Sequence, residues 1–172
     1  MNKSNIVLCG FMASGKTGIG LSVAKKLGME FCDIDKYIEK KESMSVSEIF
    51  EKCGESAFRE AESLAVLELS KLEGKVIACG GGTVLNKNNI EAFYSFNNKI
   101  YFLDVPLAAL QERLKSDKSR PLIQKPNRRE IIEQLYNERI SRYREAADII
   151  IDAGAPVNVV VKRIIKEAET AE

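Results

Sequence analysis

Short apolar segments rich in β-branched residues alternate along this chain with segments that carry apolar residues at helical spacing. Five of the apolar segments predict strands, at residues 5–9, 30–33, 75–79, 99–104 and 148–151. Their apolar positions do not alternate cleanly with polar ones, which is typical of strands covered on both faces. Strands that alternate with helices in this way predict an α/β fold with a parallel sheet.

The segments between these strands predict helices whose ends are marked by glycine, proline and capping residues. Ser45 and Glu48 have the spacing of a capping box, Gly54 is expected to break the helix they open, and Pro106 is expected in a first helical turn. The expected helices cover residues 16–27, 34–41, a short helix from 45, then 55–72, 86 or 88 to 93, 106–115, 128–144 and a last helix to about 168. Residues 116–127 are polar and basic with two prolines, and we expect a loop there.

The composition adds one exclusion that narrows the chemistry. The 172 residues, 45% hydrophobic and 30% charged, fit one globular domain, and no apolar run approaches the roughly 18 residues of a membrane span. Histidine is absent, which excludes Ser-His and Cys-His nucleophiles and HExxH zinc enzymes. Acid–base chemistry must therefore come from carboxylate, lysine, tyrosine or cysteine side chains.

The net charge argues against nucleic acid as a partner, and the cysteine spacing indicates the cell compartment. The net charge is only +1, whereas a general nucleic-acid binder is usually far more basic. Residues 113–129 carry seven basic side chains and one acid, but no aromatic residues are interleaved for base stacking. Cys9, Cys32, Cys53 and Cys79 form no CxxC pair, so we interpret them as small buried thiols and expect a protein of the reducing cytoplasm.

The strongest motif is GFMASGKT at residues 10–17, which matches G-x-x-x-x-G-K-[ST] between a predicted strand and a predicted helix. The glycines let the backbone wrap a phosphate, and the helix N-terminus adds positive potential. Lys16 can reach the β- and γ-phosphates, and the Thr17 hydroxyl can bind Mg²⁺. The motif predicts a nucleotide-binding P-loop.

Two further groups of residues follow predicted strands. Asp33 and Asp35 lie two apart on an extended chain, so both can face a ligand crevice, one near a metal and one as a proton acceptor. They can equally be solvated turn carboxylates or a helix N-cap. The glycines at residues 80–82 indicate either close approach to the backbone, a requirement for positive φ, or a plain turn.

Three arginines stand in different segments, and singly each is most simply a surface side chain. Arg120 differs from Arg59 and Arg139 because it lies in the basic loop with flanking prolines. Such a loop can close over a triphosphate and exclude water, or it can be solvated and without function.

These pieces occur together, and in this order the chain resembles the shikimate kinase family over nearly its whole length. The resemblance is carried by GFMASGKT, Asp33-x-Asp35, Phe58-Arg59 with Glu62, GGG at 80–82, Arg120-Pro121-Leu122, and Glu138-Arg139 with Tyr143. It implies a nucleoside-monophosphate-kinase-like fold whose five-stranded parallel sheet has the order 2-3-1-4-5. It also implies one domain over residues 1–172, with a substrate-binding helical segment at about 34–61 and a lid at about 116–127.

The resemblance implies a phosphotransferase that uses ATP as co-substrate and one Mg²⁺ ion to phosphorylate shikimate. Thr17 and Asp33 would serve the metal, and Lys16, Arg120 and Asp35 would be catalytic, Asp35 accepting the hydroxyl proton. The residues implied for the nucleotide are Ala13, Ser14, Gly15, Lys16, Thr17, Gly18, Arg113, Arg120 and Pro156. The residues implied for shikimate are Asp35, Arg59, Gly80, Gly81, Gly82 and Arg139, the two arginines on its carboxylate.

The chain departs from the family pattern in three places. Gly18 stands where a second hydroxyl residue is usual, Ser141-Arg142 replaces a common Pro-Leu, and the loop before Pro156 is short and lacks an arginine. The alternatives are a kinase of gluconate or a nucleoside monophosphate, and a regulatory P-loop switch, although no N/T-K-x-D motif of a GTPase is present. We expect a monomer that binds neither nucleic acid nor membrane.

Overall fold

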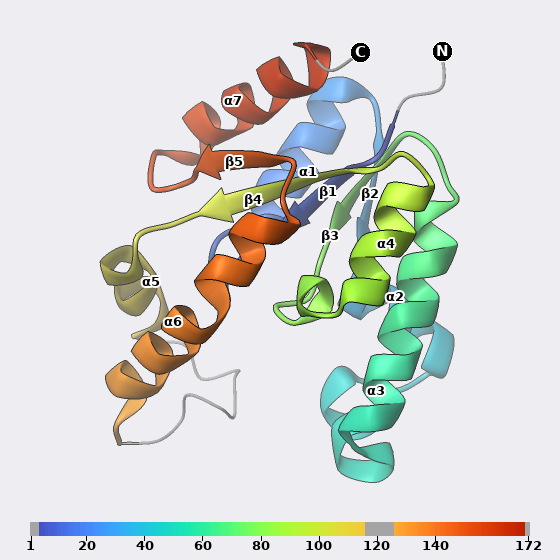
Figure 1. The fold of residues 1–172 in the computed structure, drawn as a ribbon, viewed down its shortest axis with the longest axis vertical. Coiled ribbons are helices and arrows are strands. Elements are labelled where there is room, and N and C mark those ends of the chain that lie inside the picture. Colours follow the sequence, from blue (N-terminus) through green and yellow to red (C-terminus); the bar gives the residue numbers. More distant parts are fainter. Residues whose placement is uncertain (1–3, 116–125, 171–172) are drawn as a thin grey trace.

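One parallel sheet of five strands forms the centre of the molecule, and its order is β2-β3-β1-β4-β5 (Figure 1). The computed structural model describes residues 4–115 and 126–170. The strands are β1 (Ile6–Cys9), β2 (Glu30–Asp33), β3 (Lys75–Ala78), β4 (Lys99–Asp104) and β5 (Ile149–Asp152). The predicted fold class and strand order are therefore confirmed.

Helices cover both faces of this sheet (Figure 1). Helices α1 and α7 contact each other on one side, and α4 and α6 pack over β4 on the other, with α3 against α4. The helices are α1 (Lys16–Leu27), α2 (Ile34–Glu42), α3 (Val46–Ser70), α4 (Lys87–Ser95), α5 (Leu107–Leu114), α6 (Arg128–Ala146) and α7 (Val157–Thr170), with a 3₁₀ turn η1 at Thr83–Leu85. None of the helices in the described ranges has both the length and the apolar character of a membrane span.

Local signals in the sequence explain several of these boundaries. The Ser45 and Glu48 capping box is present, and Gly54 kinks α3 with φ 85° and ψ 172°, a conformation open essentially to glycine alone. Asn86 caps α4 by accepting from the Asn88 amide. Pro106 lies at the N-cap of α5, one residue before the first turn in which it was expected, because its ψ of 138° is extended.

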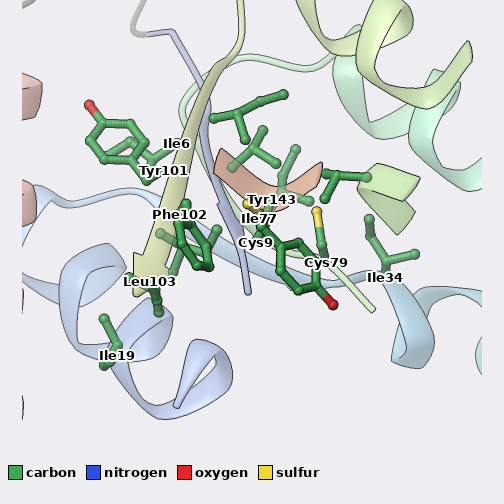
Figure 2. Packing of buried hydrophobic residues seen from close by; sticks show 14 of the residues in the cluster. Ile6, Cys9, Ile19, Ile34, Ile77, Cys79, Tyr101, Phe102, Leu103 and Tyr143 are labelled. Carbon is green, nitrogen blue, oxygen red and sulfur yellow. The ribbon is translucent and has the colours of Figure 1, made fainter. Parts of the chain in front are cut away.

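The core is centred on β1, whose four residues are all buried. Successive residues of a strand face opposite sides of the sheet. Accordingly, Phe102 of β4 stacks on Tyr143 of α6, with ring centroids 5.5 Å apart, and Tyr101 points the other way (Figure 2). Cys9 and Cys79 are buried in this core, Cys32 is half-buried and Cys53 is exposed, so the expectation of buried thiols holds fully only for Cys9 and Cys79 and is wrong for Cys53.

A buried pair of asparagines ties the strands together at the end opposite to the P-loop. The Asn5 amide nitrogen donates to Leu72 O at 2.6 Å and to Asn98 Oδ1 at 2.5 Å, and Asn5 Oδ1 accepts from the Lys75 amide at 2.8 Å. Asn98 in turn donates to Phe93 O at 2.9 Å. Both side chains are almost completely buried, so each bond satisfies a group that water cannot reach.

Replacing Asn5 by alanine should lower the free energy of unfolding by about 2–4 kcal/mol, because it leaves several buried backbone groups unpaired. For a chain of this size that corresponds to a fall in Tm of about 4–16 °C. Thermal unfolding by circular dichroism measures this change. Turnover at 25 °C should stay within about twofold of wild type, and a stability change below about 1 kcal/mol would contradict the interpretation.

Candidate active site

The loop between β1 and α1 wraps around an open space in the way a phosphate-binding loop requires. Gly10 and Gly15 have φ of 150° and 93°, and Ala13 adopts φ 60°, which is uncommon for a residue with a side chain. The Lys16 ammonium lies back on this loop and donates to the Gly10 and Phe11 carbonyls, each at 2.9 Å. The strand–loop–helix context predicted from the motif is therefore present.

A pocket of about 300 Å³ opens above this loop, at the carboxyl ends of β1, β2 and β3. Ligands of open α/β sheets bind at such strand ends. The pocket is lined by Met12, Ala13, Gly15, Lys16, Thr17, Gly18, Asp33, Asp35, Cys79, Gly80 and Gly81. The tertiary structure thus brings three predicted groups together, namely the P-loop, the aspartate pair and the glycine run.

Asp33 takes one of the roles considered for it, that of a helix N-cap, and its other carboxylate oxygen bonds to the P-loop. It caps α2, with Oδ1 accepting from the Lys36 amide at 3.3 Å, and its Oδ2 accepts from the Thr17 hydroxyl at 3.1 Å. The extended-chain argument for the aspartate pair is wrong, because Asp35 already lies in the first turn of α2. Both carboxylates nevertheless face the same pocket. Within the described ranges no cluster of three or more acidic or cysteine side chains could hold a metal by itself.

Asp35 is the carboxylate with the most unusual surroundings. Its Oδ1 is buried and has no hydrogen-bond partner within the described part of the chain. Burial, followed by the nearby charges of Asp33 and Glu62, raises the pKa of Asp35 from 3.8 to about 6, although Lys16 acts in the opposite direction. A carboxylate with this pKa is still mostly ionised at neutral pH and is a better proton acceptor than a free aspartate.

The glycine run allows close approach of side chains to the backbone. A Cβ at Gly80 would lie 3.0 Å from Asp35 Oδ1, and one at Gly82 would lie 2.8 Å from Arg59 Nη1. None of the three glycines at 80–82 is among the residues with positive φ. Of the alternatives considered for this run, positive φ is therefore wrong, whereas close approach and a turn are both present, the Thr83 amide donating to Gly80 O at 3.3 Å.

Arg59 and Arg139 lie beside the glycine run from two different helices. Arg59 Nη1 donates to Glu62 Oε2 at 2.9 Å, and the buried Glu62 also accepts from the Thr83 hydroxyl at 2.7 Å. Arg139 Nη1 lies 3.8 Å from the position of a Cβ at Gly81. Glu62 was noted in the sequence only as part of a family pattern, and its spacing three residues after Arg59 on a helix is the signal for this ion pair.

Other predicted site residues lie at the margin of the pocket or outside it. Arg113 reaches the P-loop and donates to Ala13 O at 3.1 Å. Ser14 is buried under the loop with its Oγ 3.4 Å from Lys16 Nζ. Pro156 is exposed just before α7 and is not among the residues that line the pocket. Arg120 and residues 116–125 of the expected lid lie outside the described residues.

Two lining residues were not among the predicted site residues, although one lies within a predicted motif and the other directly before one. Met12 occupies a variable position of the P-loop, and Cys79 immediately precedes the glycine run. Burial holds the pKa of the Cys79 thiol well above its usual range, so it is a poor nucleophile. The chemistry that the site can perform therefore rests on phosphate binding, a carboxylate base and guanidinium groups.

Known proteins share both this sequence and this architecture. The family model for shikimate kinase matches residues 12–169. A shikimate kinase of Thermodesulfovibrio yellowstonii is 43% identical over 166 residues, which are 96% of this chain and 95% of that protein. A solved structure of shikimate kinase from Acinetobacter baumannii in complex with shikimate is 33% identical, has a TM-score of 0.89 and covers 98% of this chain and 94% of that one.

A more distant likeness bears on the alternative substrate. A gluconokinase from Sinorhizobium meliloti superposes with a TM-score of 0.63 over 98% of this chain and 93% of that one, but only 14% of the residues are identical. That similarity shows a common fold and nothing more about the acceptor. Since the family model spans nearly the whole chain and the relatives match almost end to end, this protein belongs to the shikimate kinase family.

Proposed function

We propose that the pocket above the P-loop transfers the γ-phosphoryl group of ATP to a hydroxyl of shikimate, yielding shikimate 3-phosphate and ADP. As a shikimate kinase, the protein is a phosphotransferase of aromatic amino acid biosynthesis. The observation that carries the proposal is the buried Asp35 Oδ1, which lacks a hydrogen-bond partner in the described structure and shares one pocket with Lys16 and Thr17.

On the nucleotide side, the loop amides and Lys16 hold the β- and γ-phosphates. Thr17 and Asp33 offer two oxygens, 3.1 Å apart, at the mouth of the loop. A hydroxyl and a carboxylate suit Mg²⁺, which takes few protein ligands and keeps waters and phosphate oxygens. When bound, Mg²⁺ neutralises charge on the β- and γ-phosphates. Arg113, beside Ala13, adds positive charge at the outer side of the loop.

On the acceptor side, Asp35 orients the attacking hydroxyl and takes its proton. The hydroxyl oxygen bonds to the γ-phosphorus while the bond to the β–γ bridging oxygen breaks, and the electron pair leaves with ADP. Because the transition state is loose, positioning and charge neutralisation supply most of the catalysis. Arg59 and Arg139, with the backbone of Gly80, Gly81 and Gly82 between them, hold the carboxylate of shikimate as a charge-assisted clamp.

The wider organisation follows from the same proposal. Residues 1–172 form one catalytic domain, in which α2 and the first part of α3, at about 34–61, bind the acceptor. Residues 116–127 act as a lid that brings Arg120 to the phosphates. We propose that the enzyme works as a monomer in the cytoplasm.

A coupled assay of ADP release tests the acceptor directly. With ATP and Mg²⁺ present, shikimate should give turnover, whereas gluconate and AMP at the same concentration should give little above background. Omission of Mg²⁺ should remove the activity. Turnover with gluconate or AMP that equals turnover with shikimate would contradict the proposed acceptor.

Replacing Arg139 by alanine should raise the KM for shikimate by about 30-fold or more, because loss of a charge-assisted contact to a carboxylate costs about 2–5 kcal/mol. Arg59→Ala should act in the same direction, and both variants should leave the KM for ATP nearly unchanged. Steady-state kinetics with each substrate varied separately measure the two constants.

The carboxamide analogue of shikimate provides the control for this prediction, because it keeps the shape and removes the charge. The wild-type enzyme should discriminate strongly against it. Both arginine variants should lose most of that discrimination. Equal discrimination in wild type and variants would place the two arginines outside the acceptor site.

A further inference from the structure

The hydroxyl of Tyr143 lies beside two groups, Gly81 and Arg139, that the proposed function places around the carboxylate of shikimate. It donates to the Gly81 carbonyl at 2.5 Å. The Arg139 guanidinium, one turn earlier on α6, lies close enough to this hydroxyl to act on the pKa of Tyr143, which it lowers against the effect of burial. Since the one proton of the phenol goes to Gly81, the oxygen can act only as an acceptor toward this guanidinium.

This hydroxyl is not needed to fill space in the core. The Tyr143 side chain is 1% exposed, and its ring stacks on Phe102 of β4 (Figure 2). A phenylalanine would fill the same volume and would avoid burying a polar oxygen. The Tyr143 hydroxyl instead donates to the glycine run near Arg139, and burial, partly opposed by Arg139, raises the pKa of Tyr143 to about 12. The hydroxyl therefore stays protonated and keeps donating throughout the working pH range.

Two consequences follow for the glycine run and the arginine. The bond from the Tyr143 hydroxyl to the Gly81 carbonyl fixes the orientation of the peptide plane between Gly81 and Gly82. The glycines have no side chains that could restrain this plane themselves. An acceptor oxygen beside the Arg139 guanidinium favours one position of this long side chain, which otherwise loses considerable rotamer freedom when it binds a ligand. Arg59 is ion-paired with the buried Glu62 on its own helix, so each arginine of the clamp lies beside one buried polar group.

We infer that Tyr143 is a positioning residue for the acceptor: its hydroxyl holds the Gly81 peptide and the Arg139 guanidinium in the geometry that binds the carboxylate of shikimate. The inference rests on the proposed function, because it assumes that Gly81 and Arg139 bind the acceptor. Tyr143 itself is too deeply buried to touch the substrate.

The test is Tyr143→Phe, which removes one oxygen and keeps the ring. The KM for shikimate should rise about tenfold, with kcat within about threefold of wild type and the KM for ATP unchanged. Discrimination between shikimate and its carboxamide analogue should fall. If the hydroxyl had only a structural role, its removal would lower Tm and leave the KM for shikimate and the discrimination unchanged. That outcome would overturn the inference.

Tyr101→Phe is the matched control. Tyr101 is also 1% exposed, but it lies on β4 next to Phe102 and points to the side of the sheet away from Tyr143 (Figure 2). This variant should leave both KM values within about twofold of wild type. An increase in the KM for shikimate equal to that of Tyr143→Phe would overturn the inference, because any buried hydroxyl would then have the same effect.

A double variant separates action through Arg139 from a general effect. In an Arg139→Ala background, Tyr143→Phe should raise the KM for shikimate by clearly less than it does alone, because residues that act as a unit are not additive. An undiminished effect would overturn the inference. If the wild-type enzyme accepts the carboxylate and the carboxamide equally, the proposed acceptor site is wrong and the inference fails with it. If only the variants behave contrary to expectation, the inference alone is wrong.

Discussion

Replacing Asp35 by asparagine is expected to remove nearly all turnover and, at the same time, to make the protein more stable. The change keeps the size of the side chain but removes the proton acceptor, and general-base catalysis typically contributes about 10²–10⁴ to the rate. We therefore expect kcat to fall by about that factor. ATP binding should change little, because the loop that holds the phosphates is untouched.

The gain in stability follows from the raised pKa. Asp35 has a pKa of about 6 in the folded protein against 3.8 ordinarily, so between these values the folded state binds the extra proton. Stability from this group is therefore fully present below about pH 4 and is lost as the pH rises through 6. The loss amounts to about 1–3 kcal/mol. The side-chain amide in the Asp35→Asn variant never ionises, so the variant avoids this loss.

Thermal unfolding across the pH range measures the effect. At pH 7.5 the Asp35→Asn protein should have a Tm higher than wild type by about 2–12 °C, and the difference should vanish near pH 4. Asp33→Asn is the matched control two residues away, and it should instead raise the Mg²⁺ concentration needed for activity. A Tm difference that is independent of pH would contradict the buried, ionised Asp35. Equal Mg²⁺ titrations of the two variants would contradict the division of roles between Asp33 and Asp35.

The pH dependence of wild-type activity should report the ionisation of Asp35. With ATP saturating, kcat/KM for shikimate should fall below about pH 6 as Asp35 becomes protonated. The fall should be close to tenfold per pH unit, because one group titrates. A profile that stays flat down to pH 5 would exclude Asp35 as the base.

Replacing Lys16 by alanine should reduce kcat by about 10²–10³, the usual loss when one fixed charge that stabilises the transition state is removed. The protein should remain folded, because alanine is well tolerated in α1 and the lost contacts include only local hydrogen bonds to the loop, to the Gly10 and Phe11 carbonyls at 2.9 Å and to the Ser14 hydroxyl at 3.4 Å. Single-turnover kinetics with saturating ATP measure the chemical step separately from binding.

Lys25→Ala is the control for this change, since Lys25 is an exposed lysine on the same helix. Its kcat should equal that of wild type. Lys16 also lowers the pKa of Asp35, so the residual activity of Lys16→Ala should decline at a higher pH than wild-type activity does. A folded Lys16→Ala enzyme with normal kcat would contradict the phosphate-binding role.

The elements of this protein could be predicted because their signals are local. Five apolar segments, the capping box at Ser45 and Glu48, and the glycine at 54 mark the boundaries of strands and helices. The P-loop could be identified for the same reason, since its function depends on the backbone of one continuous segment. The position of Pro106 was predicted one residue too far into its helix, because the ends of helices depend on backbone angles that flanking residues adjust.

The remainder of the site depends on contacts between distant segments. The pattern around Asp35 suggested a carboxylate on an extended chain, whereas its burial, the missing partner of its Oδ1 and the neighbouring Glu62 exist only once α2, α3 and the glycine run have packed together. The bond from Tyr143 to Gly81 joins residues 62 positions apart. The sequence by itself therefore determined the strands, the helices and the phosphate-binding loop, because local conformational preference specifies them. Only the tertiary structure decided which carboxylate oxygen is buried without a partner in the described ranges and which hydroxyl lies against the glycine run, because desolvation and charge at one point are set by the whole surrounding fold.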